Sequence, residues 1–351
     1  MSNTYLPAEW AAQSAVMLTW PHPHGDWRSE LPQVDCVFAE IGYHVCRHQG
    51  LIITCWDQFH AEHITRQLRD RGAAMNRVGI YTAHSNDAWA RDHGPIAVVR
   101  DGQPTLLDFQ FNGWGDKYPA ALDNAITDTL HRQRAFGHTP LRRVDLVLEG
   151  GSIDCDGQGT LLTTRRCLLS PHRNPQLDQR HLEEALAQTL GIQRVLWLNY
   201  GHLEGDDTDS HIDTLVRFCD PDTLCYTACD DSRDSHYRAL NAMENELAAF
   251  RTAKNTAYRR IPLPIPSGKY NDNGLRLPAT YANFLIINDA VLVPTYDDPA
   301  DHLALERLSH CFPDREIIGI NCLPLIEQYG SLHCVTMQLP QGIDIEISHA
   351  G

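Results

Sequence analysis

The sequence predicts an α/β fold in which pairs of strands, each pair followed by a helix, are arranged around one axis. Three observations support this prediction. A polar or glycine-containing segment that leads into an apolar strand, a turn and a second strand recurs along the chain. Segments with the apolar spacing of helices fall between these strand pairs. No low-complexity or charged linker divides the 351 residues, so we expect a single domain over residues 1–351.

The strand pairs recur about every 50 to 70 residues, which leaves room for a helix in each unit. Their first strands are expected at residues 91–99, 150–154, 211–218, 283–287 and 330–337. Their second strands are expected at residues 105–109, 160–163, 223–226 and 290–294. If the units are arranged radially, the first strand of every unit lies at the axis. Residues from distant parts of the chain could then share one central site.

Three segments between the strand pairs have apolar residues at helical spacing. One of them, residues 177–190, carries Leu182, Leu186 and Leu190 on one face. The other two are residues 237–250 and 300–312. We therefore expect a helix in each of these three segments.

The chain is acidic and has enough apolar residues to bury a large core. Its formal net charge is −16, and 42% of its residues are hydrophobic. Nucleic acids and anionic membranes both require a basic face on their partner, so we exclude both as partners. An acidic protein instead attracts a small cation.

Eleven cysteines occur in the sequence without a dense, regular spacing. An odd number of cysteines in a chain of this length favours reduced thiols over a disulfide framework. The first residues lack the basic and apolar regions of a secretion signal, and no apolar run approaches membrane-spanning length. We therefore expect a cytoplasmic protein.

Five residues with complementary chemistry occur in short motifs along the chain. Cys334 stands near the C-terminus, and upstream motifs contain Asp92 and Glu149. His211 and Asp213 alternate on one of the expected strands, so their side chains should face the same way. A thiol nucleophile, a histidine that carries protons and three carboxylates are suited to attack on a carbon that bears positive charge. The set indicates guanidinium chemistry.

Taken together, these motifs resemble those of the agmatine deiminases, in the peptidyl-arginine-deiminase-like branch of the guanidino-group-modifying enzymes. The resemblance spans most of the chain. The matching segments are residues 86–95, 148–153, 173–175, 207–213 and the run around Cys334. Each motif alone is a weak signal, whereas the set is specific. The resemblance implies a five-bladed α/β propeller with pseudo-fivefold ββαβ repeats, as one catalytic domain over residues 1–351.

The resemblance also implies a role for each of these side chains. Cys334 would be the nucleophile and His211 the general acid and base. Asp92 and Asp213 would hold the guanidinium nitrogens, and Glu149 would orient His211. The thiolate would add to the guanidinium carbon, His211 would protonate the departing ammonia, and neutral His211 would activate water against a covalent thiouronium. This route requires no metal or organic cofactor.

The substrate implied by the resemblance is agmatine, a small cationic guanidine whose hydrolysis yields N-carbamoylputrescine and ammonia for polyamine synthesis or agmatine catabolism. Trp89 would line the substrate tunnel. The acidic residues 206–209 favour a substrate with a distal amine, and Asp207 is the residue expected to bind that amine. Another guanidine, such as peptidyl-arginine or free arginine, stays open as the substrate, and a homodimer stays open as the assembly.

The carboxylates create an electrostatic problem for the nucleophile. They should raise the pKa of the Cys334 thiol above its ordinary value of about 8.5. We hypothesise that the bound substrate cation, together with protonated His211, stabilises the thiolate.

Two other classes of function compete with deimination. A metal-dependent hydrolase is suggested by Glu40, His44 and His48, which would share one helix face, although no His-Glu-x-x-His or paired Cys-x-x-Cys motif occurs. A non-catalytic binder of guanidino compounds is the second alternative. The presence of a complete set of reacting groups argues against a binder, and a Cys334→Ser variant that binds but releases no ammonia would separate the two.

Overall fold

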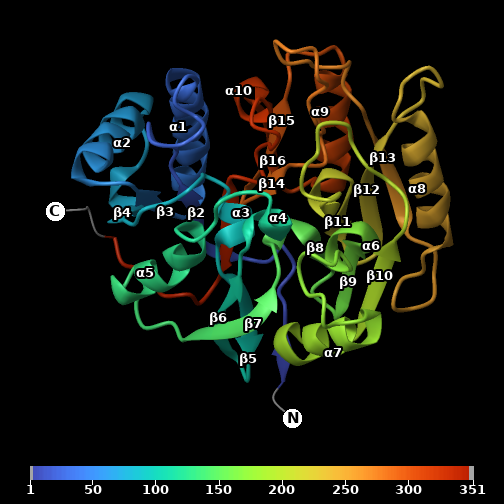
Figure 1. Ribbon diagram of the computed structural model, residues 1–351, viewed down its shortest axis with the longest axis horizontal. Coiled ribbons are helices and arrows are strands. Elements are labelled where there is room, and N and C mark those ends of the chain that lie inside the picture. Colours follow the sequence, from blue (N-terminus) through green and yellow to red (C-terminus); the bar gives the residue numbers. More distant parts are fainter. Residues whose placement is uncertain (1–2, 348–351) are drawn as a thin grey trace.

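Five small β-sheets surround a common centre in the computed structural model, which describes residues 3–347 (Figure 1). The first sheet contains β5 (Ile96–Arg100), β6 (Gln103–Gln110) and β7 (Leu141–Val147), with β1 (Thr4–Tyr5) at its edge. The second sheet contains β8 (Ile153–Cys155), β9 (Thr160–Thr164) and β10 (Arg194–Leu198). The next two sheets contain β11 (Val216–Asp220), β12 (Thr223–Ala228) and β13 (Arg259–Pro264), and β14 (Leu285–Ile286), β15 (Ala290–Thr295) and β16 (Glu316–Asn321). The fifth contains β17 (Thr336–Pro340), β2 (Gln13–Thr19), β3 (Gly50–Cys55) and β4 (Val78–Thr82). Five sheets around one centre agree with the predicted five-bladed α/β propeller.

The same connection is repeated in every sheet. Two neighbouring strands run antiparallel, and the next strand runs parallel to the second, as in β5, β6 and β7. The chain reaches the parallel strand through a helix, as the ββαβ repeat requires. These helices are α5 (Ile126–Arg132), α7 (Gln179–Leu190), α8 (Tyr237–Ala249), α9 (Ala300–Cys311) and α1 (Leu31–His48).

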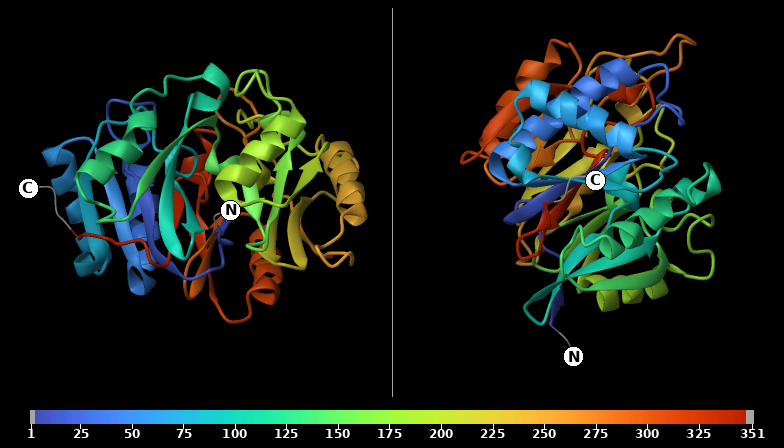
Figure 2. Two further views of the ribbon diagram at one scale, coloured as in Figure 1. Left: turned by 90° about the horizontal axis from the view of Figure 1, so that it is seen from below. Right: turned by 90° about the vertical axis from the view of Figure 1, so that its left-hand side faces the viewer.

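Strands from the two ends of the chain close the ring. Strand β17 pairs antiparallel with β2, with Thr336 opposite Leu18 and Met337 opposite Met17. The left-hand view of Figure 2 shows red β17 beside the blue strands of this sheet. The C-terminal segment that carries Cys334 is thereby fixed to the N-terminal strands.

The three predicted helices are confirmed as α7, α8 and α9, each with ends within two residues of the prediction. Helix α7 begins where the Asp178 side chain accepts a hydrogen bond from the His181 N–H, and it ends at Gly191, whose φ of 73° suits glycine. Its Leu182, Leu186 and Leu190 are buried, as the spacing predicted. Among the helices of residues 3–347, none combines the length and the apolar character needed to cross a bilayer.

The first strands of the units are shorter than predicted, because the chain turns before it enters the sheets. Short helical turns replace the predicted start of three of these strands: α3 (Ala90–His93), η3 (Gly150–Ser152) and η4 (Ile212–Thr214). In the last unit the strand starts at Thr336. The prediction that His211 and Asp213 alternate on a strand is therefore wrong, since β11 starts only at Val216.

Local hydrogen bonds and crowding at the centre explain these turns. The Thr214 hydroxyl donates to the His211 carbonyl at 2.9 Å, which favours a turn over a strand. In η3, a Cβ on Gly151 would lie 2.7 Å from the His211 Nδ1 and 2.8 Å from an Asp92 oxygen. A side chain at this position would displace site residues, so a glycine is required there.

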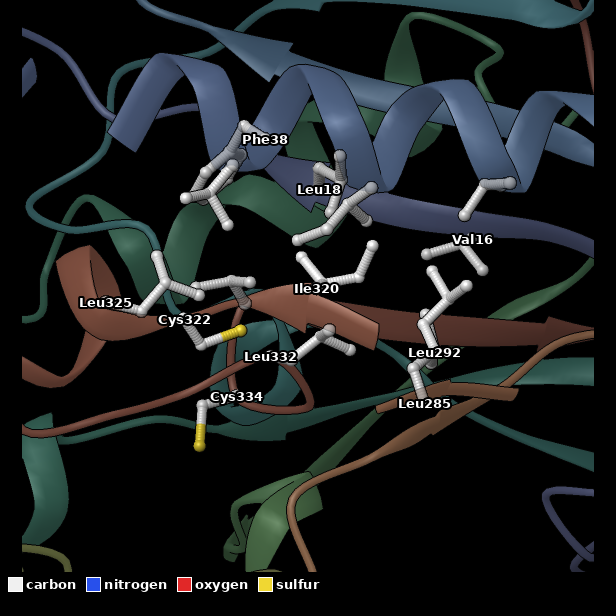
Figure 3. Close-up of a cluster of buried hydrophobic side chains, with 14 of the residues drawn as sticks. Val16, Leu18, Phe38, Leu285, Leu292, Ile320, Cys322, Leu325, Leu332 and Cys334 are labelled. Atoms are coloured by element: carbon white, nitrogen blue, oxygen red, sulfur yellow. The ribbon is translucent and has the colours of Figure 1, made fainter. Parts of the chain in front are cut away.

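A large apolar cluster supports the segment that carries Cys334. Leu18 from β2, Phe38 from α1 and Ile320 from β16 belong to this cluster and are buried. Figure 3 shows Leu332 among these side chains and Cys334 at the border of the cluster, with its sulfur pointing away from them. The core thus fixes the backbone of Cys334 and leaves the thiol outside the apolar packing.

Candidate active site

The turns at the inner ends of the blades border one pocket, whose empty volume is about 760 Å³ with its open mouth included. Six of the seven predicted site residues line it, namely Trp89, Asp92, Asp207, His211, Asp213 and Cys334. They come from segments separated by long stretches of sequence, and Figure 1 shows α3, which contains Asp92, near the centre of the ring. The radial arrangement therefore brings the predicted residues together.

Cys334 is buried among acceptor groups at the base of this pocket. Its Sγ lies 3.9 Å from the Asp213 Oδ2 and 3.4 Å from the Asn283 Oδ1. Burial raises the pKa of the Cys334 thiol well above its usual range, and the charges of Asp213 and Asp92 raise it further. Without a bound cation, the thiol form is therefore favoured.

Asp213 has one occupied and one free carboxylate oxygen. Its Oδ2 faces the His333 Nδ1 at 2.8 Å and accepts from the Asn283 Nδ2 at 3.2 Å. Its Oδ1 is buried and has no hydrogen-bond partner in the described residues. Burial acts to raise the pKa of Asp213, but the hydrogen bond to His333 and the charges of His333, His211 and Arg217 together leave the pKa below its usual value. The free oxygen is a ready acceptor for a guanidinium N–H.

Asp92 is held on α3 by neutral donors. Its Oδ2 accepts from the Trp114 Nε1 at 2.9 Å, and its Oδ1 accepts from the Gly151 N–H at 3.0 Å. Burial raises the pKa of Asp92 to about 6, although the positive charge of His211 counteracts the shift. A second carboxylate thus faces the pocket in a different electrostatic state from Asp213.

His211 is fully buried and lies close to Asp92. Its Nδ1 is 3.7 Å from the Asp92 Oδ1, and its Nε2 has no hydrogen-bond partner in the part of the chain that the structure describes. Burial acts to lower the pKa of His211, but the Asp92 charge and the neighbouring Cys167 thiol raise it well above its ordinary value. The imidazolium can therefore donate a proton at neutral pH.

Glu149 lies behind the pocket wall, next to His211. Both of its oxygens accept from the Arg173 Nε, at 2.8 and 3.1 Å, and the Arg173 Nη1 contacts Asp209 at 2.6 Å. Ligand atoms of Glu149, Cys167 and His211 lie within 4.8 Å of one another, which is the spacing of a metal-ion site. However, the Arg173 guanidinium already occupies the Glu149 carboxylate, so a metal ion would have to compete with it.

The rest of the pocket lining, which we call its mouth, is acidic and aromatic. Asp26, Asp87, Asp206 and Asp207 all line it, and the Tyr118 hydroxyl donates to the Asp207 Oδ2 at 2.8 Å. Burial raises the pKa of Asp207, and this hydrogen bond counteracts the shift. Among the residues described as lining the pocket, none is Arg or Lys. Such a mouth suits a positively charged group.

Trp89 packs beside this acidic mouth. Its ring centroid lies 5.4 Å from that of Trp27, whose Nε1 donates to Asp87 at 2.7 Å. A Cβ on Gly330 would lie 2.2 Å from the Trp89 ring, so the indole is enclosed. Trp89 is thus placed as a fixed wall of the pocket.

Sequence reasoning missed several residues that contact the predicted set. Trp114 binds Asp92, Asn283 binds Asp213, and His333 bridges Asp213 to Glu9. His333 directly precedes Cys334, and this adjacency is the one signal that could have identified it. The others stand in segments that carry no titratable motif.

The residues that suggested a metal-dependent hydrolase do not gather at this pocket. On α1, the His44 Nε2 pairs with Glu40 at 3.0 Å, while the His48 Nδ1 pairs with Asp289 at 3.1 Å. Each histidine is thus paired with one carboxylate. The suggested set is therefore divided between two separate contacts.

Comparisons with known proteins agree with the geometry. The sequence description of the Porphyromonas-type peptidyl-arginine deiminase family matches residues 5–340. A Vibrio parahaemolyticus protein named "Putative agmatine deiminase" is 34% identical over 356 residues, which cover 96% of each chain.

Solved structures match over nearly the whole chain. The structure named "Putative Arginine Deiminase from Porphyromonas gingivalis" has a TM-score of 0.92 and 47% identity, and the match covers 98% of this chain and 100% of that one. The structure of a cysteine-to-serine variant of the C. jejuni agmatine deiminase with substrate bound has a TM-score of 0.90 and 36% identity. That match covers 97% of this chain and 98% of the C. jejuni chain.

Proposed function

Because the chain belongs to the Porphyromonas-type peptidyl-arginine deiminase family, we propose that it hydrolyses agmatine to N-carbamoylputrescine and ammonia. One observation carries this proposal. A thiol, an imidazole with a raised pKa and two carboxylates of opposite pKa shift border a single pocket, and one carboxylate oxygen is unoccupied. These groups supply a nucleophile, an acid and two acceptors for a guanidinium.

Binding of the guanidinium is the first step. The free Oδ1 of Asp213 accepts an N–H from one side of the planar cation, and Asp92 accepts from another. The cation then lies next to Cys334 and partly cancels the two carboxylate charges that raise its pKa. Substrate binding therefore favours the thiolate.

The reaction then proceeds through a covalent intermediate. The Cys334 thiolate adds to the guanidinium carbon, and the His211 imidazolium gives a proton to the departing nitrogen, so that the C–N bond breaks and ammonia leaves. Neutral His211 next takes a proton from a water that adds to the thiouronium carbon. Collapse of this adduct breaks the C–S bond and releases the urea product. Glu149 supports His211 from behind the pocket wall.

The mouth of the pocket favours agmatine over arginine. The distal amine of agmatine meets Asp207 and its acidic neighbours. Free arginine would also bring a carboxylate into a mouth whose described lining has no Arg or Lys to bind it. Trp89 forms the enclosed wall that the aliphatic chain contacts.

We further propose that the whole reaction takes place in one catalytic domain in the cytoplasm. The cysteines in the described part of the chain are unpaired, which suits a reducing compartment. The product would enter polyamine synthesis.

Ammonia release tests the proposal. Purified wild-type protein and the Cys334→Ser variant are compared on agmatine, free arginine and a blocked peptidyl-arginine. We expect release from agmatine that the variant loses. Release from arginine or the peptide with none from agmatine would contradict the substrate assignment, and release by the variant would contradict the nucleophile.

A further inference from the structure

A buried imidazole connects the substrate-binding carboxylate to a glutamate outside the pocket. The His333 Nδ1 lies 2.8 Å from the Asp213 Oδ2, and its Nε2 lies 3.0 and 3.1 Å from the two oxygens of Glu9. The His333 side chain has no exposed surface. Both ring nitrogens therefore face carboxylates. A neutral imidazole has only one N–H donor, so two ionised carboxylates require the imidazolium.

Glu9 is held in the ionised state by two arginines. It pairs with Arg217 and, at 3.4 Å, with the Arg91 Nη1, and the Gln338 Nε2 donates to its Oε2 at 3.0 Å. Burial acts to raise the pKa of Glu9, but the positive charges of Arg217, His333 and Arg91 hold it well below the usual range. Glu9 is therefore an anion in contact with His333.

The charge of His333 depends on its two carboxylate partners. Burial and the Arg217 and Arg91 guanidiniums hold the pKa of His333 below its ordinary value, although Glu9 and Asp213 counteract part of the shift. The contact geometry nevertheless favours the imidazolium, because a bare nitrogen lone pair 3.0 Å from the Glu9 carboxylate would be repelled. Loss of the Glu9 charge should therefore favour the neutral, deprotonated form of His333.

The contact with His333 fixes how Asp213 presents its carboxylate. His333 and Asn283 both occupy the Oδ2, so the Oδ1 is left free. A carboxylate released from His333 could rotate, and both oxygens would then share the available donors. Its charge would also act on Cys334 without the opposing imidazolium.

We propose that Glu9 and His333 are positioning residues for the reaction: Glu9 holds the His333 ring, and His333 holds one oxygen of Asp213 so that the other faces the guanidinium. This inference rests on the proposed function and adds residues outside the pocket lining. Neither residue is required to contact the substrate.

Asp154 supplies a matched control. Its Oδ2 contacts the Arg217 Nε at 3.2 Å and accepts from the Phe218 N–H at 2.8 Å. It belongs to the same buried ion network as Glu9, but no hydrogen bond or ion pair joins it to His333 in the described residues. Burial raises the pKa of Asp154 to about 7, so Asp154→Asn alters this network at the Arg217 contact without removing a partner of His333. A purely structural role predicts equal effects of Glu9→Gln and Asp154→Asn.

The first readout is agmatine binding, measured by calorimetry in the Cys334→Ser background. We expect Glu9→Gln to weaken binding by about tenfold or more and Asp154→Asn to change it by no more than about twofold. Equal losses in both variants would overturn the proposal, as would unchanged binding in Glu9→Gln. If Glu9→Gln does not fold, Glu9→Asp keeps the charge with a shorter reach and should give a smaller loss in the same direction.

The second readout needs no substrate. The pH dependence of Cys334 alkylation by iodoacetamide is followed by mass spectrometry in otherwise wild-type protein. We expect Glu9→Gln to move the midpoint upward by about one pH unit and Asp154→Asn to move it less. Identical profiles for Glu9→Gln and wild type would overturn the proposal. Because this assay is independent of turnover, it tests the contacts from Glu9 through His333 to Asp213 even if the protein hydrolyses no guanidine.

Discussion

Two acidic walls of the pocket, α3 with Asp92 and η4 with Asp213, hold the same residue type in opposite electrostatic states. On one wall, Asp92 accepts from the neutral Trp114 indole and a backbone N–H, and burial raises its pKa to about 6. On the other wall, Asp213 contacts His333, and its pKa lies below the usual value although it is equally buried. Burial alone therefore does not decide the ionisation of a buried carboxylate: the imidazole of His333 lies 2.8 Å from Asp213, whereas the nearest imidazole to Asp92, that of His211, lies 3.7 Å away.

The largest expected effect comes from removing the charge on the Asp213 wall. Asp213→Asn should lower kcat/KM for agmatine roughly thirtyfold to several thousandfold, because the guanidinium and His333 both lose an ionised partner. This factor corresponds to a loss of about 2–5 kcal/mol of stabilisation. Steady-state ammonia release measures this loss. A variant that retains more than about half of the wild-type kcat/KM would show that Asp213 is not a guanidinium acceptor.

Removing the charge on the other wall should have a smaller effect. Asp92→Asn keeps an oxygen for Trp114 but loses a charge-assisted hydrogen bond, worth about 1.5–3 kcal/mol or roughly tenfold to a hundredfold in kcat/KM. The same assay measures it. If Asp92→Asn proves more damaging than Asp213→Asn, Asp213 is not the stronger guanidinium acceptor of the two.

The two walls should also respond oppositely in stability. Asp92 has a folded-state pKa of about 6, above the ordinary value, so its ionised form destabilises the fold above that pH. Asp92→Asn removes this titration but places an amide NH2 against one of the two N–H donors, so we expect its free energy of unfolding relative to wild type to rise by up to about 3 kcal/mol from pH 4 to pH 8. Asp213→Asn, which removes a group with a lowered pKa, should destabilise the fold at pH 8. Urea unfolding of wild type and both variants at pH 4 and pH 8 checks these signs, and an Asp92→Asn stability that does not rise relative to wild type between the two pH values would contradict them.

The raised pKa of Asp92 predicts an acidic limb in the pH profile. Asp92 must be ionised to accept from the guanidinium, so kcat/KM should fall by about tenfold per pH unit below about 6. Asp213 should remain ionised over the same range because its pKa is lowered. Measurement of kcat/KM from acid to neutral pH in wild type and Asp92→Asn tests this. A limb of unchanged position in the variant would assign the titration to another group.

The smallest expected effect concerns the neutral donor on the Asp92 wall. Trp114→Phe removes the indole N–H but retains an aromatic ring, so it should cost about 1 kcal/mol, or roughly fivefold in kcat/KM. It should also move the acidic limb upward, because the Trp114 hydrogen bond lowers the pKa of Asp92. A loss in rate with an unchanged limb would assign Trp114 a packing role only.

Much of the fold could be predicted because strands, turns and helices have local periodic signals. The spacing of Leu182, Leu186 and Leu190 predicted α7, and the repeated strand pairs predicted the radial arrangement. The inner ends of the strands were predicted wrongly, because apolar alternation carries no information about the Thr214 hydroxyl bond that turns the chain after His211. The single domain over residues 1–351 stays a prediction.

The residues of the candidate site also fall into those that the sequence predicted and those that it did not. Cys334 and His211 stand in motifs whose residue types indicate the chemistry, so sequence reasoning could place them in one pocket. Glu9 gave no such signal, because its partner His333 is 324 positions away and only the closing of the ring by β2 and β17 brings the two ends together. Contacts between distant segments depend on the tertiary arrangement, which local patterns do not specify.

Covalent attack by Cys334 is the step on which the proposed mechanism depends, and it can be trapped by acid quenching during turnover. Wild-type protein is mixed with agmatine, quenched within the first turnovers and digested for mass spectrometry. We predict that the peptide containing Cys334 gains the mass of agmatine less ammonia, and that the Cys334→Ser protein shows neither this adduct nor ammonia release. Rapid ammonia release by the Cys334→Ser protein, or an adduct on another cysteine, would contradict the claim.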